Sequence, residues 1–190
     1  EVDASGRRVA LVTFDPSDLD AAYAELDARY AAGEGAPHAA TGEMSQGIGR
    51  TVASRDWERL AAVLTEEFVF EDHRMLGLGT RSRDEAVTLW RAMVDLAPDV
   101  RLFADHVLAI NHRGALHAVR WVGTRDGGAF EIPFLTLWLL GPDGRIRRSH
   151  AYDLDQQGAA RACFDALANE QAAPRIENAA TRFLRIPPNA

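Results

Sequence analysis

Two histidines and a tyrosine are the most reactive combination of side chains in this sequence. His150 and Tyr152 are two residues apart in the strand-like segment Arg145–Asp153, so both point to one face of a sheet. His73 follows Asp72 at the end of another strand-like segment. Histidine exchanges protons near neutral pH, and a tyrosine hydroxyl can polarise a carbonyl. His73, His150 and Tyr152 are therefore the candidate catalytic residues if the domain carries out acid–base chemistry.

The same residues also have a structural interpretation. His73 could fix the glycine-rich loop Met75–Thr80, and Asp72 could accept backbone hydrogen bonds. His150 and Tyr152 could simply fill the bottom of a pocket. Because adjacent strand residues point to opposite faces, only one of Asp72 and His73 can enter a pocket. The sequence leaves the catalytic and structural interpretations open.

Aromatic residues on two further strands predict a mostly apolar binding pocket. On the segment Gly114–Gly123, His117 and Trp121 share a face, and Phe134 and Trp138 share a face of Ala129–Leu140. Both faces of the longer strand are apolar, which is expected if one lines a pocket and the other meets an interface or a helix. Tryptophans in such strands are more typical of a core or a pocket wall than of a platform for nucleic-acid bases. The ligand-binding residues that we predict are Asp72, Trp90, His117, Trp121, Phe134 and Trp138.

The sequence favours neither a metal nor a cofactor. The six histidines are scattered, and no two of them have the i, i+2 spacing of metal ligands on a strand. The single cysteine, Cys163, lies beside Phe164 in a helical segment and is expected to pack there. We therefore predict no metal site and no cofactor.

Composition limits the partners and the compartment. The 190 residues carry a net charge of −7 and have a pI near 5.3, which argues against nucleic acid or an anionic membrane as a partner. No apolar run approaches the roughly 20 residues of a membrane span, and one cysteine cannot form an internal disulfide. We expect a cytoplasmic protein.

Turn signals divide the chain into three parts. Residues 1–36 contain the strand-like segment Arg7–Phe14 and an Ala-rich helix. Gly6-Arg7 and Phe14-Asp15 recur as Gly144-Arg145 and Tyr152-Asp153, at an offset of 138 residues (144 − 6), ahead of a similar helix. This predicts that residues 1–36 are the tail of a preceding copy of the domain that residues 37–170 form. Residues 171–190 are expected to be a flexible tail.

Within residues 37–170 the elements follow the order helix, helix, strand, helix and then four strands in an antiparallel meander. A capping box at Ser82 and Glu85 starts the third helix, and Asp155 starts the helix that closes the domain. Segregated helices and strands indicate an α+β fold, with helices on one face of a curved sheet.

This order and several short phrases resemble the SnoaL-like branch of the nuclear transport factor 2-like superfamily. The phrases are Arg55–Leu60, Asp72-His73, Pro98-Asp99, Gly123-Thr124 with Gly128, and Asp143–Ile146. The resemblance implies a cone-shaped barrel: a strongly curved antiparallel sheet with helices packed on its concave face and a pocket at the wide end. It also implies polyketide cyclase-like relatives, homodimers formed through the outer face of the sheet, and, by analogy, a tandem copy in a large actinobacterial multidomain protein.

Several positions depart from the family's enzymes. The general-base aspartate of the cyclases would fall near Leu135-Thr136-Leu137, which contains no acid, and their Thr-His hairpin is Thr124-Arg125 here. We therefore expect first a non-catalytic or sensory domain that binds a small, mostly apolar ligand within a larger protein. The alternatives are a cofactor-free lyase, isomerase or cyclase acting on a carbonyl-bearing substrate, and a dimerisation module whose pocket is filled.

Overall fold

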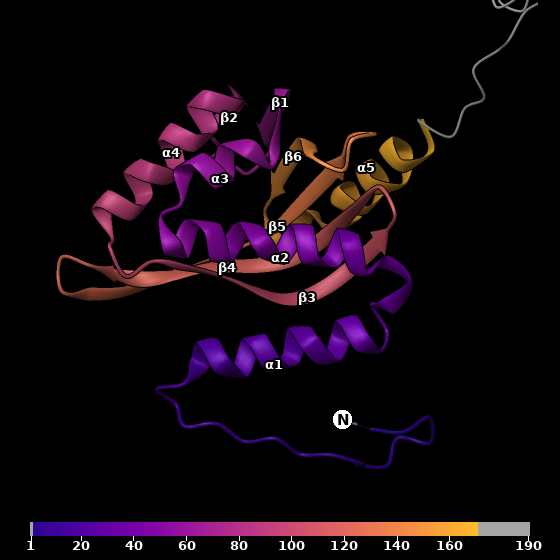
Figure 1. Ribbon diagram of the computed structural model, residues 1–190. Coiled ribbons are helices and arrows are strands. Elements are labelled where there is room, and N and C mark those ends of the chain that lie inside the picture. The colour runs from indigo at the N-terminus through magenta and orange to yellow at the C-terminus, as the bar shows by residue number, and fades with distance from the viewer. Residues whose placement is uncertain (1, 171–190) are drawn as a thin grey trace, which may run out of the picture.

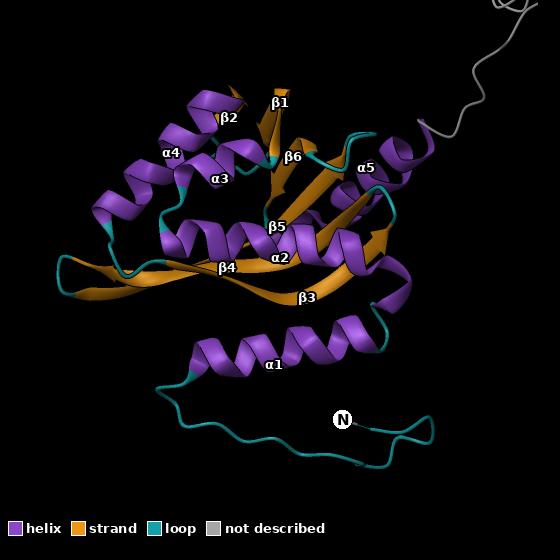
Figure 2. Cartoon of the chain, viewed as in Figure 1, coloured by secondary structure: helices purple, strands orange, loops and turns teal. Residues whose placement is uncertain are grey.

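The fold is a six-stranded sheet with helices on both faces, seen in a computed structural model that describes residues 2–170 (Figures 1 and 2). The strands are β1 (Leu64–Asp72), β2 (Gly79–Ser82), β3 (Arg101–Asn111), β4 (Gly114–Arg125), β5 (Gly128–Leu140) and β6 (Ile146–Tyr152). The helices are α1 (Leu19–Ala32), α2 (Ala39–Ser54), α3 (Trp57–Ala62), α4 (Arg83–Leu96) and α5 (Gln157–Glu170), with 3₁₀ turns at Ala36–His38 and Leu154–Gln156. The expected α+β class and the order of elements are confirmed.

The strand order is β2-β1-β6-β5-β4-β3, and all neighbours are antiparallel except β1 and β6. Four strands form the expected meander, while β1 returns to pair in parallel with the last strand. The sheet is curved but not closed, and α2, α3 and α4 lie on its concave face (Figure 1). This is the cone that the resemblance implied. Strand β2 replaces the last part of the predicted glycine-rich loop.

The main core lies inside the cone. Buried side chains of α2, α3 and α4, Trp90 among them, pack there against inward-facing residues of the sheet such as Phe68 and Trp138. Asp56 caps α3 by accepting a hydrogen bond from the Arg59 backbone amide, 3.0 Å. The predicted capping box starts α4, where Glu85 accepts from the Ser82 backbone amide, 2.8 Å. These two caps fix where α3 and α4 of the inner layer begin, and the second of them was predicted from the sequence.

A second core lies on the outer face of the sheet. Helix α5 packs Ala160 and Phe164 against outward-facing leucines of β4 and β5 and against Tyr152 of β6. The two cores explain why both faces of β5 are apolar: one lines the cone, and the other receives a helix. Because α5 covers part of this face, the expected homodimer surface is partly occupied within the chain itself, and the homodimer stays a prediction.

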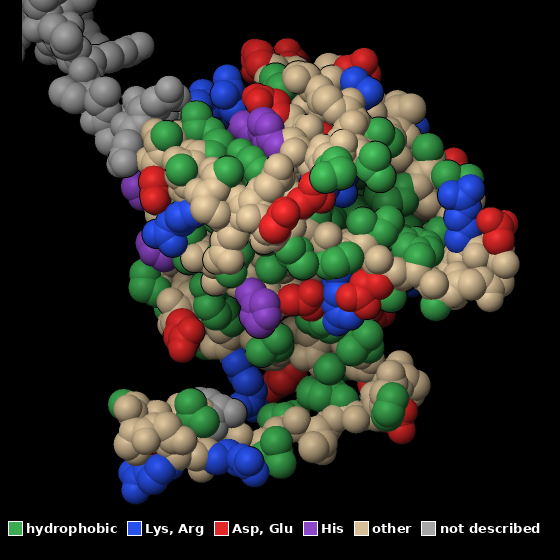
Figure 3. All heavy atoms as spheres, turned by 180° about the vertical axis from the view of Figure 1, so that it is seen from behind, with side chains coloured by type: hydrophobic (Ala, Val, Ile, Leu, Met, Phe, Trp, Pro, Cys, Tyr) green, Lys and Arg blue, Asp and Glu red, His purple; other side chains and the backbone are tan. Residues whose placement is uncertain are grey.

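The N-terminal region differs from expectation. Arg7–Phe14 is not a strand; it contributes only an isolated bridge between Val2 and Arg8, and Val9, Leu11 and Phe14 are exposed. A strand needs a neighbour to accept its backbone hydrogen bonds, and no sheet edge of the described chain reaches this segment. In the space-filling view from behind, this segment stands apart from the body of the molecule (Figure 3). The preceding-copy hypothesis stays a prediction, and the predicted tail, 171–190, lies outside the described residues.

Helix α1 is present as predicted but has no buried residue. It lies beside β3, on the other side of that strand from α2 (Figure 1). Its contact with the sheet is partly aromatic, since the Tyr23 ring stacks on Phe103 with centroids 4.6 Å apart. It is also polar: the Tyr23 hydroxyl donates to Asp105, 3.3 Å, and Arg120 donates to both Asp105 and Tyr23. Among the described residues no helix is long and apolar enough to cross a membrane.

The β3–β4 hairpin supplies a test of the packing. A side chain at Gly114 would collide with the backbone carbonyl oxygen of Trp138 on β5, whereas Gly158 in α5 faces open space. We expect Gly114→Ala to lower the free energy of unfolding by about 2 kcal/mol, because the clash must separate β4 from β5. Gly158→Ala, the control, should be neutral or stabilise by up to about 1 kcal/mol. Urea denaturation measures both changes, and equal stability of the two variants would contradict this register of β4 and β5.

Candidate functional site

The candidate site is an apolar cavity inside the cone, between the sheet and helices α2 and α4. Its volume is about 150 Å³. Residues that line it include Trp90, Trp121, Phe134 and Trp138, four of the predicted ligand-binding residues. Trp90 and Trp138 meet at a tilt, with ring centroids 6.4 Å apart, so the wall is aromatic on two sides. Three of these side chains come from faces that strand alternation had grouped, and Trp90 comes from helix α4. Their role in ligand binding stays a prediction.

Two side-chain hydroxyl groups lie in this apolar wall. Thr136 of β5 and Ser149 of β6 both line the cavity. Ser149 is fully buried, and its Oγ has no hydrogen-bond partner among the described residues. An unpaired buried hydroxyl costs about 1–3 kcal/mol, so a polar group of a ligand that reached it would recover that cost. The sequence analysis missed Ser149 because it assigned the opposite face of β6 to the pocket.

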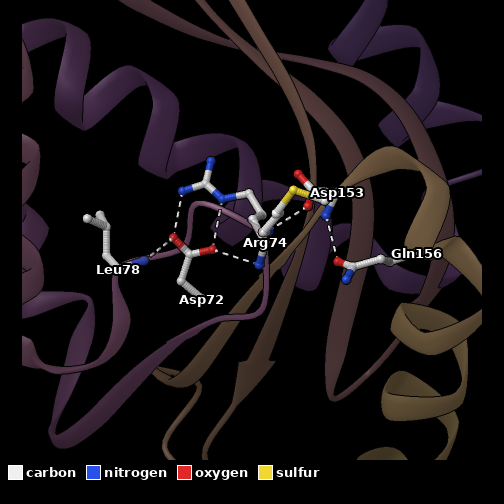
Figure 4. Close-up of polar contacts among 6 residues, drawn as sticks. Asp72, Arg74, Leu78, Asp153 and Gln156 are labelled. Atoms are coloured by element: carbon white, nitrogen blue, oxygen red, sulfur yellow. Dashed lines mark hydrogen bonds and ion pairs between the residues drawn. The ribbon is translucent and has the colours of Figure 1, made fainter.

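An ion pair stands at the edge of the cavity (Figure 4). Arg74 donates from Nε to Asp72 Oδ1, 2.8 Å, and from its terminal nitrogen to Oδ2, 2.7 Å. The Leu78 backbone amide also donates to Asp72, 3.1 Å, so this carboxylate gathers the loop that follows β1. The Arg74 guanidinium lies over the Phe134 ring at 5.0 Å and lines the cavity. Asp72 was predicted as a ligand contact; Arg74, which stands between it and the cavity, was not.

The charge state of Asp72 follows from these contacts. Burial by itself would raise the pKa of this carboxyl, but the hydrogen bonds from Arg74 and the Leu78 amide outweigh burial and hold the pKa below its usual range. Asp72 is therefore an ionised acceptor whose lone pairs are engaged. A carboxylate in this state is a poor general base.

The loop after Arg74 is anchored at its start as well. The Met75 backbone amide donates to Asp153, 2.8 Å, and Gln156 accepts from the Asp153 amide, 2.9 Å (Figure 4). The side chains of Met75 and Leu76 are nonetheless almost fully exposed, at 91% and 93%. The segment of residues 75–78 therefore has two anchored ends and an exposed apolar tip, and we call it the flap at the edge of the cone.

The predicted catalytic residues lie on the other face of the sheet. In the pairing of β5 with β6, His150 is opposite Leu137 and Tyr152 opposite Leu135, and these leucines belong to the outer core beneath α5. None of His73, His150 and Tyr152 lines the cone cavity. The expectation that His150 and Tyr152 face the pocket is therefore wrong. Alternation correctly grouped the side chains of each strand, but it cannot say which group faces inward.

These three residues do come together. His73 Nε2 and His150 Nδ1 are 3.1 Å apart, and the Tyr152 ring stacks on His73 with centroids 4.6 Å apart. Burial lowers the pKa of His150 to about 4 and raises the pKa of the Tyr152 hydroxyl, so both are neutral at pH 7. Glu71, which the sequence analysis did not single out, lies 3.9 Å from both ring nitrogens.

His117 is the sixth predicted ligand contact, and it faces a different space. It lines a crevice of about 450 Å³ between α1, α2 and β3. This crevice is larger than the cone cavity, but helix α1, which has no buried residue, forms one of its walls. His117 is buried, and neither ring nitrogen has a partner in the described chain. Burial lowers its pKa to about 4, which keeps the imidazole neutral.

A curved sheet with helices on its concave face and an apolar cavity between them defines a class of protein. Sequence comparison assigns the chain to this class. The profile of the SnoaL-like domain family matches residues 48–149, more than half of the chain, and the chain belongs to this family. A search of curated proteins found no match.

Solved structures with low sequence identity share the fold. Wild-type IdmH, a putative polyketide cyclase from Streptomyces antibioticus, is 17% identical, with 57% of this chain and 88% of that one covered at a TM-score of 0.51. RV0760c from Mycobacterium tuberculosis, in complex with estradiol-17beta-hemisuccinate, is 15% identical. The match covers 61% of this chain and 95% of that one at a TM-score of 0.51. A computationally designed 17-OHP binder is 16% identical. The match covers 61% of this chain and 92% of that one at a TM-score of 0.51. These likenesses establish the fold alone.

The Asp72–Arg74 pair gives a prediction for stability. Asp72 is fully buried and Arg74 mostly so, and Asp72→Asn leaves the guanidinium without its partner. We expect a loss of about 3 kcal/mol in the free energy of unfolding at pH 7. Because the folded-state pKa is lowered, this stabilisation is present above about pH 4 and is lost as the pH falls further. Urea denaturation should show a large difference in stability between the wild type and Asp72→Asn at pH 7 and a small one at pH 3. The control Asp126→Asn removes an exposed carboxylate and should leave the free energy of unfolding unchanged at both pH values. A loss in this control equal to that of Asp72→Asn would indicate a general effect of charge.

His117 gives a prediction for acid sensitivity. Its pKa is about 4 in the folded protein and near 6.5 when exposed, so the unfolded chain takes up the proton first. Stability therefore falls as the pH drops from about 6.5 to 4, by about 3 kcal/mol from this residue. His117→Leu should reduce that fall in pH-dependent urea denaturation, while His106→Gln, at an exposed position, should leave it intact. An unchanged pH profile in His117→Leu would contradict the neutral buried state.

Proposed function

We propose that this domain binds a small, mostly apolar molecule in the cone cavity and does not transform it. The observation that carries the proposal is Ser149 Oγ, a buried hydroxyl without a partner in a wall of aromatic rings. Ligand pockets combine such apolar walls with a few polar groups that fix orientation. A ligand with one carbonyl or hydroxyl group would satisfy Ser149 and bury the rest of its surface against Trp90, Trp121 and Trp138.

The volume of the cavity limits the size of the ligand. A dry protein cavity of about 150 Å³ holds benzene, and the cone cavity has the same volume. A single-ring ketone or alcohol therefore fits. The steroid named in the RV0760c complex and the 17-OHP of the designed binder are larger, so they support an apolar ligand in this fold and not a steroid in this chain. A larger ligand would require the flap that follows Arg74 to move.

The chemistry of the lining favours binding over catalysis. No carboxylate is among the described residues that line the cavity, and Asp72, the ion-pair partner of its lining residue Arg74, is a weak base because its pKa is lowered. His73, His150 and Tyr152 lie across the sheet, so a substrate in the cone would not touch them. The alternative of a cofactor-free lyase, isomerase or cyclase has no such support. We retain the expectation that the domain is a sensor within a larger protein, alone or beside a second copy, as part of this proposal.

A pair of matched ligands tests the proposal. Acetophenone and ethylbenzene are similar in size, but only acetophenone carries a carbonyl that can accept from Ser149. In titrations followed by the indole N–H resonances, we expect Trp90, Trp121 and Trp138 to shift. Trp57 packs on the core outside the cavity and serves as the internal control. Ser149→Ala should weaken the binding of acetophenone about fivefold, since a neutral hydrogen bond contributes about 1 kcal/mol. It should leave the binding of ethylbenzene unchanged.

A cavity-filling variant provides the opposite test. Ser149→Leu should abolish the binding of both compounds because its side chain occupies the cavity. Equal binding by this variant would place the ligand elsewhere. Failure of the wild-type protein to bind either compound would overturn the proposal and favour the dimerisation module with a filled cone.

A further inference from the structure

Glu71, His73 and His150 form a cluster on the outer face of the sheet, which we call the outer cluster. The parallel pairing of β1 with β6 sets Glu71 directly beside His150. His73 lies two residues beyond Glu71, and its backbone amide donates to the Ala151 carbonyl at 2.9 Å, which extends the β1–β6 ladder. Residues two apart on a strand point to the same face, so three side chains from two strands converge.

We propose that the outer cluster binds a divalent transition-metal ion of the zinc type. The ligand atoms are His73 Nε2, His150 Nδ1 and Glu71 Oε2, separated by 3.1 Å, 3.9 Å and 3.9 Å. A point equidistant from three atoms with these separations lies about 2.1 Å from each of them. Zinc binds imidazole nitrogen at about 2.0–2.1 Å and carboxylate oxygen at about 2.0–2.2 Å, so an ion fits between the atoms as they stand.

The two imidazoles already point their ring nitrogens at one another. In the metal-free protein one hydrogen bond joins His73 Nε2 to His150 Nδ1, and a single proton lies between them. With both rings neutral, the ring that donates this hydrogen bond has no proton on its other nitrogen. When an ion binds between the rings, the donated proton leaves to solvent and the donor ring takes one up on its other nitrogen. Both rings then stay neutral, with protons on Nδ1 of His73 and Nε2 of His150. Tyr152 stacks on the His73 ring and Gln156 donates to the His73 carbonyl, 3.3 Å, so the more exposed ligand is held in place.

The donor set selects the class of metal. Two imidazoles and one carboxylate suit zinc and other first-row divalent ions, whereas calcium and magnesium require oxygen ligands. His73 and Glu71 are partly exposed, at 39% and 31% of their side chains, and the third ligand is buried. Three protein ligands and access to solvent leave a position for water or an exchangeable anion, the arrangement of an open rather than a closed structural zinc site.

Two features limit the affinity. His150 Nε2 is buried without an acceptor in the described chain, although metal-bound histidines normally donate their second N–H. Arg148 lies on the same face of β6 and brings a positive charge towards His150. We therefore expect a micromolar dissociation constant, tight enough for a defined 1:1 complex.

The outer cluster is independent of the proposed ligand cavity. Glu71 and Asp72 are adjacent in β1 and point to opposite faces, so the metal and the apolar ligand occupy opposite sides of the same strand. The failure of one proposal therefore leaves the other intact.

Calorimetric titration of the untagged full chain with zinc chloride tests the inference. The expected result is one ion per chain with micromolar affinity, and cobalt(II) in its place should give visible d–d absorption typical of nitrogen and oxygen ligands. Glu71→Gln and His73→Asn change partly exposed side chains, so both variants should fold. Each should weaken the binding of zinc at least tenfold. His106→Asn, an exposed histidine of β3, is the matched control and should bind as the wild type does.

The histidine ring resonances provide a readout at the ligand atoms. Zinc should fix His73 as the Nδ1–H tautomer and His150 as the Nε2–H tautomer, whether or not acetophenone is present. Undiminished zinc binding in both Glu71→Gln and His73→Asn, or the absence of a 1:1 complex at micromolar zinc, would overturn the inference. Ser149→Leu should bind zinc normally, which separates this result from the test of the cone cavity.

Discussion

The parallel pairing of β1 with β6 is the contact on which both candidate sites depend. In this register Phe70 lies beside Ser149 and Asp72 beside Ala151 on the concave face, while Glu71 lies beside His150 on the outer face. A shift by one residue would exchange the two faces of β1, because side chains alternate along a strand. Asp72 would then leave Arg74 and the cone, and Glu71 would leave the histidines. A single backbone register therefore supplies the polar edge of the cavity and all three side chains of the outer cluster.

The burial of the sheet on both faces holds that register in place. The helices of the inner layer cover the concave face, and α5 covers the outer face of β4, β5 and β6. Each apolar residue that would be exposed by a slip costs about 1.5–3 kcal/mol, so neither face of β5 can turn to solvent. Function can therefore be carried by a few polar groups in these layers, since their positions are fixed by the apolar side chains around them.

The polar groups in the two layers differ in how they are satisfied. Asp72 is engaged by hydrogen bonds that hold its charge, whereas Ser149 Oγ and the ring nitrogens of His117 have no partners in the described chain. Buried polar groups are normally paired, so these exceptions mark positions where a ligand or a change of pH has the most effect. The pair His73–His150 is intermediate, because one shared proton satisfies two nitrogens that a metal ion could bind equally well.

The sequence by itself determined the α+β class, the order of the elements, the capping box at Ser82, and which aromatic side chains share a strand face. These follow from local periodicity, turn chemistry and strand alternation, which are properties of neighbouring residues. Only the tertiary structure decided which face of β6 looks inward, and it replaced His150 and Tyr152 by Ser149 in the cavity wall. It also brought His73 within 3.1 Å of a histidine 77 residues away, beside Glu71. Alternation fixes faces only relative to one another, and the pairing of distant strands is set by the packing of the whole sheet between its two helical layers.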